Sequence, residues 1–177
     1  MSQPVASASA APDRRLWLLV ISLVVLLLDR LTKYWVSTRI DEGDAIVVIR
    51  HVFRITHVRN PGAAFSMFTD SPKPELTRWV LTGFSMIAAA VILFVIFRFG
   101  RRLTPTMVAL ALILGGTIGN LWDRLASGLV TDFLEVHIVH YHWPDFNVAD
   151  SAIVCGGILL ILDSMRPSSR TLGTPKS

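Results

Sequence analysis

The sequence predicts an α-helical integral membrane protein with four transmembrane helices and a small extracytoplasmic β-rich cradle after the first helix. Two observations lead to this prediction. Hydrophobic residues make up 52% of the 177 residues and charged residues only 17%, whereas charged residues make up about 25% of a typical soluble domain. The hydrophobic residues are also gathered into four long blocks, and do not recur at the period of a soluble core.

The first block follows Arg14 and Arg15. Residues 16–28 contain no charge, and basic residues before such a run are also typical of a signal peptide. The block continues through charged residues without a small-residue cleavage site, so we interpret residues 16–36 as one helix. At 1.5 Å per residue this helix would be about 31 Å long, which is enough to cross a bilayer.

Three further blocks predict three further spans. Residues 79–97 contain no charged side chain. Residues 105–125 begin with Pro105, which is favourable in the first turn of a helix. Residues 148–163 form a short block, so we expect the polar residues at its start to lie at membrane depth.

Lys and Arg near the span ends predict the orientation, because cytoplasmic loops are enriched in them. Basic clusters lie before the first span, between the second and third spans, and after the fourth, whereas residues 37–76 carry five basic and five acidic residues. The three clusters share one side if the chain crosses the membrane four times with both termini in the cytoplasm. We therefore expect one four-span domain at residues 14–165, a disordered cytoplasmic N-terminus at residues 1–13, and a cytoplasmic tail at residues 166–177.

Two segments are expected outside the membrane. Residues 45–49 and 51–58 are rich in Val and Ile with partial alternation, which predicts short strands. The tripeptide Asn-Pro-Gly at residues 60–62 predicts a turn. These features define the predicted cradle, at about residues 40–76, and they suit a lid over a site. Residues 129–146 form a second outer segment with a mixed pattern.

Polar residues gather toward the outer ends of the predicted spans. Ionisable groups at membrane depth are costly and by default mark function. We expect these side chains to form one layer at the outer interface. They are Asp29 and Lys33 in the first span, Asn120, Asp123 and Arg124 in the third, and Asn147 and Asp150 at the start of the fourth.

Asp132 and Asp150 form a candidate catalytic pair. They follow the third span and begin the fourth, and these spans form a hairpin, so both carboxylates can face one pocket. Two adjacent carboxylates share one proton. The ionised partner can then activate water while the protonated partner hydrogen-bonds a peptide carbonyl. From spacing alone, an equally acceptable interpretation is that the pair binds Arg124 and Lys33 to hold the helices together.

A histidine cluster suggests a different site. His137, His140 and His142 form an H-x-x-H-x-H pattern that could bind zinc in a metalloprotease. The sequence lacks H-E-x-x-H and a clear fourth ligand. We therefore prefer an interfacial loop in which Tyr141 and Trp143 contact the membrane surface, and we expect no metal and no other cofactor.

Other classes of protein fit less well. The net charge of +4 does not indicate a nucleic-acid partner, because the Arg residues flank apolar blocks. A transporter or proton relay would need a polar path across the bilayer, and a structural subunit would not need paired carboxylates. We interpret Cys155 as a packing residue, and Gly115 and Gly119 as sites of close helix contact.

Five motifs occur in order along residues 16–165. They are DRLTK at residues 29–33, NPGAAF at 60–65, GGTIGNLWDR at 115–124, VTDF at 130–133, and FNVAD at 146–150. In this combination the chain resembles bacterial lipoprotein signal peptidase, also called signal peptidase II.

The resemblance implies that Asp132 and Asp150 are the catalytic aspartates of an intramembrane endopeptidase. Its substrates would be diacylglyceryl-modified prolipoproteins, cut just before the lipidated lipobox cysteine. The implied residues that bind substrate or support the pair are Asn60, Gly62, Asn120, Asp123, Arg124, Asn147, Ala149, Asp29 and Lys33.

The resemblance also implies a location and partners. The protein would lie in the bacterial cytoplasmic membrane with its active site at the periplasmic interface. Membrane lipids would surround it, and the cyclic peptide globomycin would block it. One chain contains every part that the mechanism needs, so we expect a monomer.

Overall fold

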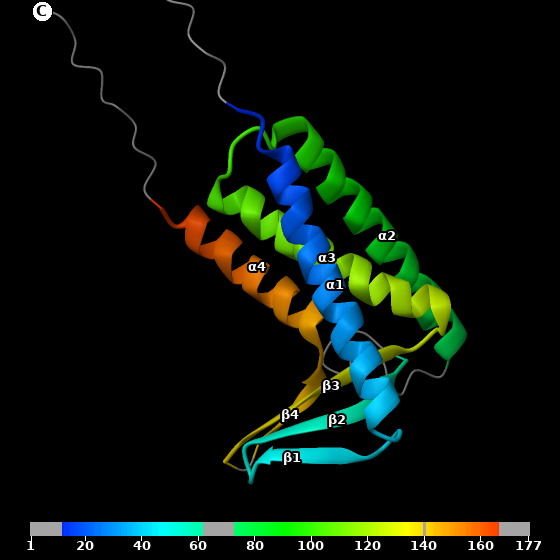
Figure 1. Cartoon of the computed structure of the whole chain (residues 1–177). Coiled ribbons are helices and arrows are strands. Elements are labelled where there is room, and N and C mark those ends of the chain that lie inside the picture. Colours follow the sequence, from blue (N-terminus) through cyan, green and yellow to red (C-terminus); the bar gives the residue numbers. More distant parts are fainter. Residues whose placement is uncertain (1–11, 62–72, 140, 167–177) are drawn as a thin grey trace, which may run out of the picture.

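The computed structural model describes residues 12–61, 73–139 and 141–166. Most of the predicted N-terminal segment and tail, the later part of the predicted cradle, Gly62 and His140 lie outside the described residues. Within them, four helices form a bundle and four strands form a sheet at one end of it (Figure 1). The elements are α1 (Arg15–Arg39), β1 (Ala45–Ile49), β2 (Phe53–Asn60), α2 (Pro74–Phe99), α3 (Pro105–Ala126), β3 (Val130–Ile138), β4 (Tyr141–Phe146) and α4 (Val148–Ser164).

Each predicted apolar block is a helix, but the helices differ in how well they suit a membrane. Among the described residues, α2 and α3 are the two helices that are long and apolar enough to cross one. Helix α1 carries charged residues in its second half, and α4 has only 17 residues. Helix α2 exposes Phe84, Ile87 and Phe94, each at least 66% accessible. A continuous apolar face of this kind is rare on a soluble monomer.

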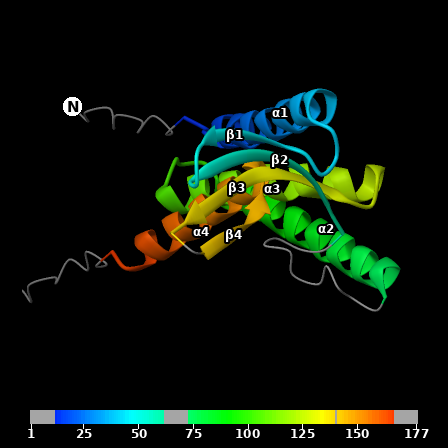
Figure 2. The same ribbon diagram turned by 90° about the horizontal axis from the view of Figure 1, so that it is seen from below.

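The sheet is antiparallel, with strand order β1-β2-β3-β4. Strands β2 and β3 pair from Phe53 with Val136 to Asn60 with Val130, although many residues separate them along the chain. The second outer segment is therefore a hairpin of the same sheet. Figure 2 shows the strands lying across one end of the bundle.

The limits of β2 differ from the prediction. The strand begins at Phe53, because His51 has a positive φ of 62° and belongs to the turn after β1. It also continues to Asn60, which was predicted to start a turn, because Asn60 pairs with Val130. This extension brings Asn60 beside the end of β3.

Helix α3 lies at the centre of the bundle and packs closely on α1 and α4. A Cβ atom added at Gly115 would lie 2.6 Å from the carbonyl oxygen of Ser22, and one at Gly119 would lie 2.7 Å from Asp29 Oδ2. The predicted close contact at these glycines is confirmed. Cys155, in contrast, is exposed on α4, so the predicted packing role is wrong.

Candidate active site

The candidate catalytic aspartates lie where the bundle meets the sheet. The chain leaves α3 through Gly128, which has a φ of 80° that glycine tolerates, and enters β3. Asp132 is the third residue of β3 and is 2% exposed. Strand β4 leads through Asn147 into α4, where Asp150 is 4% exposed. The hairpin between α3 and α4 therefore supplies both carboxylates.

A capping box at the start of α4 holds Asp150. Asn147 Oδ1 accepts the backbone N–H of Asp150 at 3.0 Å, and Asp150 Oδ2 accepts the backbone N–H of Asn147 at 3.2 Å. This reciprocal pair is a common helix-start motif. The Asp150 carboxylate accepts a second N–H at Oδ1, from Asn120 Nδ2 at 2.8 Å. Both carboxylate oxygens of Asp150 are thus positioned by donors.

Asn147 also reaches Asp132. Its Nδ2 group donates to Asp132 Oδ1 at 2.7 Å, while Asn60 Nδ2 donates to Asp132 Oδ2 at 2.9 Å. Asn147 is completely buried. One side chain therefore binds the carboxylate of Asp132 and the backbone of Asp150, and this fixes the position of one aspartate relative to the other.

Lys33 orients the amide of Asn120. Its Nζ atom lies 3.0 Å from Asn120 Oδ1, 3.0 Å from Asp29 Oδ2 and 2.8 Å from Asp123 Oδ2. An ammonium group has three protons and can only donate. Asn120 must therefore turn its oxygen toward Lys33 and its N–H group toward Asp150. Lys33 is 2% exposed, so this arrangement is shielded from water.

Asp29 joins α1 to the start of α4. Its Oδ1 atom accepts the backbone N–H of Ala149 at 3.2 Å. A carboxylate is favourable at a helix N-terminus, where unpaired N–H groups and the helix dipole attract negative charge. Ala149 is fully buried and lies against Gly116. The predicted i,i+4 pair between Asp29 and Lys33 is confirmed.

Asp123 is bound mainly by cations. It lies 2.6 Å from Arg30 Nη1 and 2.8 Å from Lys33 Nζ, and its Oδ2 atom also accepts the backbone N–H of Thr131 at 3.4 Å. Arg30 is a contact that the sequence analysis missed, although it lies within the DRLTK motif. Arg124 is 7% exposed and is attracted electrostatically to Asp150 and Asp132.

The environment of Asp132 favours its protonated form. Burial and the charge of Asp150 raise the pKa of Asp132 to about 7, against the opposing effect of the N–H groups of Asn60 and Asn147. A carboxyl group with this pKa exchanges its proton near neutral pH. Two such interacting carboxylates titrate as a pair.

Two cavities adjoin this centre. An apolar cavity of about 260 Å³ borders Asp150 and is lined by Trp143, Phe146, Ser151, Val154 and Cys155. A polar cavity of about 330 Å³ is lined by residues that include Arg30, Lys33 and Asp123. Asp150 therefore borders an apolar cavity, whereas Lys33 and Asp123 border a polar one.

The fold and this centre together define a membrane enzyme. The chain resembles a bacterial membrane enzyme solved by the in meso method at 2.3 Å resolution, with a TM-score of 0.80 and 26% identity. That match covers 96% of this chain and 100% of the other. A second bacterial membrane enzyme, solved at 1.9 Å, matches with a TM-score of 0.76 and 28% identity over 91% of this chain and 100% of that one.

Comparison of sequences identifies the family. The model of Signal peptidase (SPase) II matches residues 21–166. The lipoprotein signal peptidase of Syntrophus aciditrophicus is 42% identical over 151 residues, which cover 84% of this chain and 91% of that protein. That of Paraburkholderia phytofirmans is 42% identical over 166 residues, 94% of each protein. The chain belongs to the signal peptidase II family and is a peptidase, as the motifs predicted.

Proposed function

We propose that this chain is an aspartic endopeptidase with Asp132 and Asp150 as its catalytic pair. The observation that carries the proposal is the position of Asn147, which binds the carboxylate of Asp132 and the backbone of Asp150. Lys33 binds Asp29 and Asp123, whereas amide groups of asparagines bind Asp132 and Asp150. Lys33 therefore orients the side chains around the catalytic pair and leaves Asp132 and Asp150 available for proton transfer.

The proposed mechanism uses one shared proton. The ionised carboxylate takes a proton from water as the water oxygen attacks the peptide carbonyl, and the protonated carboxyl hydrogen-bonds the carbonyl oxygen. When the intermediate collapses, the leaving nitrogen takes up a proton from the pair. Asn60, Asn120 and Asn147 hold the two carboxylates in place through both steps. No covalent intermediate is needed.

We further propose that all four helices span the bacterial cytoplasmic membrane, with both termini in the cytoplasm and the active site at the periplasmic interface. Helix α1 begins and α4 ends at the end of the bundle opposite the sheet (Figure 1). At that end the backbone N–H of Arg14 donates to the carbonyl of Arg101 at 3.2 Å, so two basic clusters meet. Basic clusters on one side are typical of a cytoplasmic face.

The proposed substrates are diacylglyceryl-modified prolipoproteins, cut just before the lipidated lipobox cysteine. The acyl chains would hold the cysteine near the membrane interface. The apolar cavity beside Asp150, which Trp143 and Phe146 help to line, suits apolar side chains next to the cleaved bond. Globomycin is expected to compete for the same site, and one chain surrounded by lipid is expected to suffice.

The test is cleavage of a lipidated prolipoprotein by purified protein in detergent with a metal chelator present. Asp132→Asn and Asp150→Asn keep the size of each side chain and are expected to abolish cleavage. Asp41→Asn, which changes an exposed acid after α1, is the matched control and is expected to keep full activity. Thermal unfolding would verify that each variant is folded. Activity in either active-site variant would contradict the proposal.

A further inference from the structure

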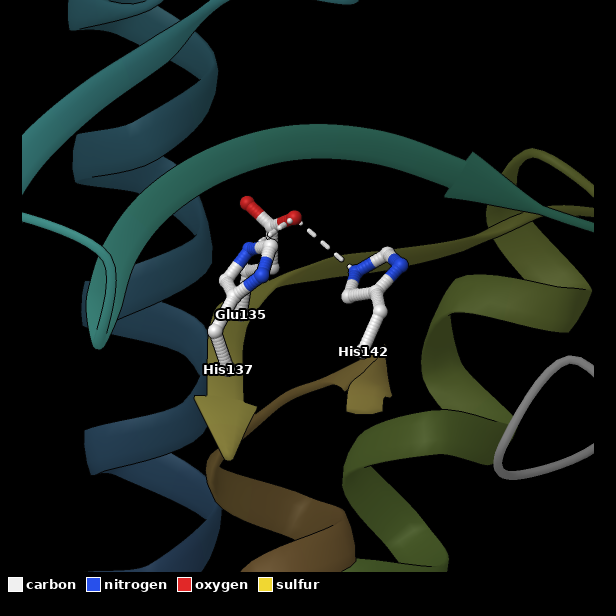
Figure 3. A group of neighbouring side chains, drawn as sticks. All are labelled: Glu135, His137 and His142. Carbon is white, nitrogen blue, oxygen red and sulfur yellow. Dashed lines mark hydrogen bonds and ion pairs between the residues drawn. The ribbon is translucent and has the colours of Figure 1, made fainter. Parts of the chain in front are cut away.

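A second cluster of polar side chains lies on the sheet, away from the aspartate pair. Glu135 and His137 lie on β3, and His142 pairs directly with His137 across the β3–β4 hairpin. Each histidine Nε2 atom lies 2.9 Å from Glu135 Oε1. Figure 3 shows both imidazole rings close to the carboxylate. The rings themselves are stacked, with their centroids 4.9 Å apart.

This cluster is separate from the proposed active site. Glu135 lies three residues beyond Asp132 on the same strand, and successive side chains of a strand point to opposite faces of the sheet. The two carboxylates therefore leave β3 on opposite sides. The signal peptidase mechanism proposed above makes no use of Glu135, His137 or His142.

The cluster combines a buried anion with an open side. The Glu135 side chain is 3% exposed, whereas those of His137 and His142 are 30% and 53% exposed. A solvated ion can thus approach past the two rings and meet the carboxylate behind them. The open side also leaves room for water as a further ligand.

We propose that Glu135, His137 and His142 bind a divalent transition metal of the zinc class. Imidazole nitrogen and carboxylate oxygen are donors that zinc prefers, in contrast to the all-oxygen sets of calcium and magnesium. The three ligand atoms lie within 4.8 Å of one another. Tetrahedral bonds of roughly 2.0–2.2 Å place donors about 3.3–3.5 Å apart. Small rotations of the partly exposed histidine side chains would be needed to reach this spacing.

Arg54 on β2 supports the proposed metal ligand. Its Nε and Nη2 groups bind both oxygens of Glu135, and this lowers the pKa of Glu135 and keeps it ionised. When Oε1 turns to the metal, the Nε contact to Oε2 remains and orients the carboxylate from outside, as hydrogen-bond partners of metal ligands commonly do. Asp145 also attracts Arg54, so the arginine keeps a second anionic partner.

The expected consequence is a stiffer sheet. The metal would join β3 to β4 through its ligands, and the contact between Arg54 and Glu135 would extend this connection to β2. The three strands lie side by side in the sheet. Bound metal should therefore raise the unfolding temperature without being required for peptide cleavage.

The test is calorimetric titration of zinc into the full chain in detergent, after removal of any affinity tag. We expect one zinc ion per chain and binding that is about 10-fold or more weaker in His142→Gln and in His137→Gln. Asp41→Asn is the control, because Asp41 is exposed and is not one of the three ligands. It should bind zinc like the wild type. The same titration with calcium should give no binding.

A second readout separates metal binding from a loss of folding. Zinc should raise the thermal unfolding temperature of the wild type and of Asp41→Asn, but not that of His142→Gln, while all three should unfold at similar temperatures without metal. Several results would overturn the proposal: no zinc binding to the wild type, equal binding by His142→Gln, or calcium binding as tight as zinc binding. The first result would leave Glu135 as a hydrogen-bonding centre only.

Discussion

Replacing Asn147 with serine separates two roles of one side chain. As the first residue before α4, Asn147 caps the helix, and a serine hydroxyl can do the same. As a neighbour of Asp132, it donates an N–H group to the carboxylate at 2.7 Å, and serine is too short to keep that contact. The comparison variant, Asn147→Ala, loses both roles.

The magnitudes follow from these contacts. An N-cap is worth about 1 kcal/mol, and a hydrogen bond to a charged group about 1.5–3 kcal/mol. We expect Asn147→Ala to lower the free energy of unfolding by about 2.5–4 kcal/mol, and Asn147→Ser by about 1 kcal/mol less. Loss of the contact that positions Asp132 should lower the cleavage rate about 100-fold in both variants, since small misplacements of catalytic groups have effects of this size.

Two assays check this prediction. Unfolding in detergent measures stability, and cleavage of a lipidated prolipoprotein across a pH series measures the catalytic pair. Because the N–H of Asn147 opposes the effect of burial on Asp132, its removal should raise the pKa of Asp132 from its value of about 7. The pH profile of the remaining activity should then shift to higher pH. Wild-type activity and an unchanged pH profile in Asn147→Ser would refute the reasoning.

Three other changes give distinct expectations. Lys33→Met should lower the free energy of unfolding by about 3–5 kcal/mol, because it removes the buried cation that binds the carboxylates of Asp29 and Asp123, and unchanged thermal unfolding would contradict this. Gly119→Ala should destabilise the protein by roughly 1–3 kcal/mol, because the new methyl group would meet Asp29 Oδ2 at 2.7 Å; denaturant unfolding would measure the change. The pKa of Asp132 is raised from 3.8 to about 7 in the folded state, so its contribution to stability should be present below pH 4 and be lost as the pH rises toward 7. Asp132→Asn should remove that part of the pH dependence of unfolding, and an unchanged slope would show that another group causes it.

The helices were predictable because long apolar blocks leave few alternatives. All four predicted blocks agree with observed helices to within a few residues at most ends. The exception is α2, which begins at Pro74, whereas the prediction began at residue 79. The sequence before residue 79 is polar, so apolar content alone could not locate this first turn.

The second half of the sheet was not predictable from local pattern. Strand β3 is buried on both faces over its first residues, so its side chains do not alternate between polar and apolar. Strand β4 mixes aromatic and polar residues without alternation and contains Pro144, which is tolerated at a sheet edge. Its assignment depends on pairing with β3, and that pairing is visible only in three dimensions.

The sequence predicted which side chains gather in the polar centre, but it did not predict which of them contact one another. The motifs identified Lys33, Asn120 and Asn147 as candidate site residues. Their spacing in the sequence does not predict which of their atoms form hydrogen bonds. That Lys33 determines the amide orientation of Asn120 follows from the geometry alone. The contact of Glu135 with Arg54 had no sequence signal, since 81 residues separate them.

The shortness of α4 has a consequence for the supply of water. A helix of 17 residues is about 25 Å long, whereas the hydrocarbon core of a bilayer is about 30 Å thick. In the proposed membrane placement, this mismatch must be met by local thinning of the lipid beside α4 or by a helix start below the outer lipid surface. Asp150 lies in the first turn of that helix. Bulk water therefore comes within reach of the aspartate pair from the outer surface, and the hydrolytic reaction needs no channel through the bundle.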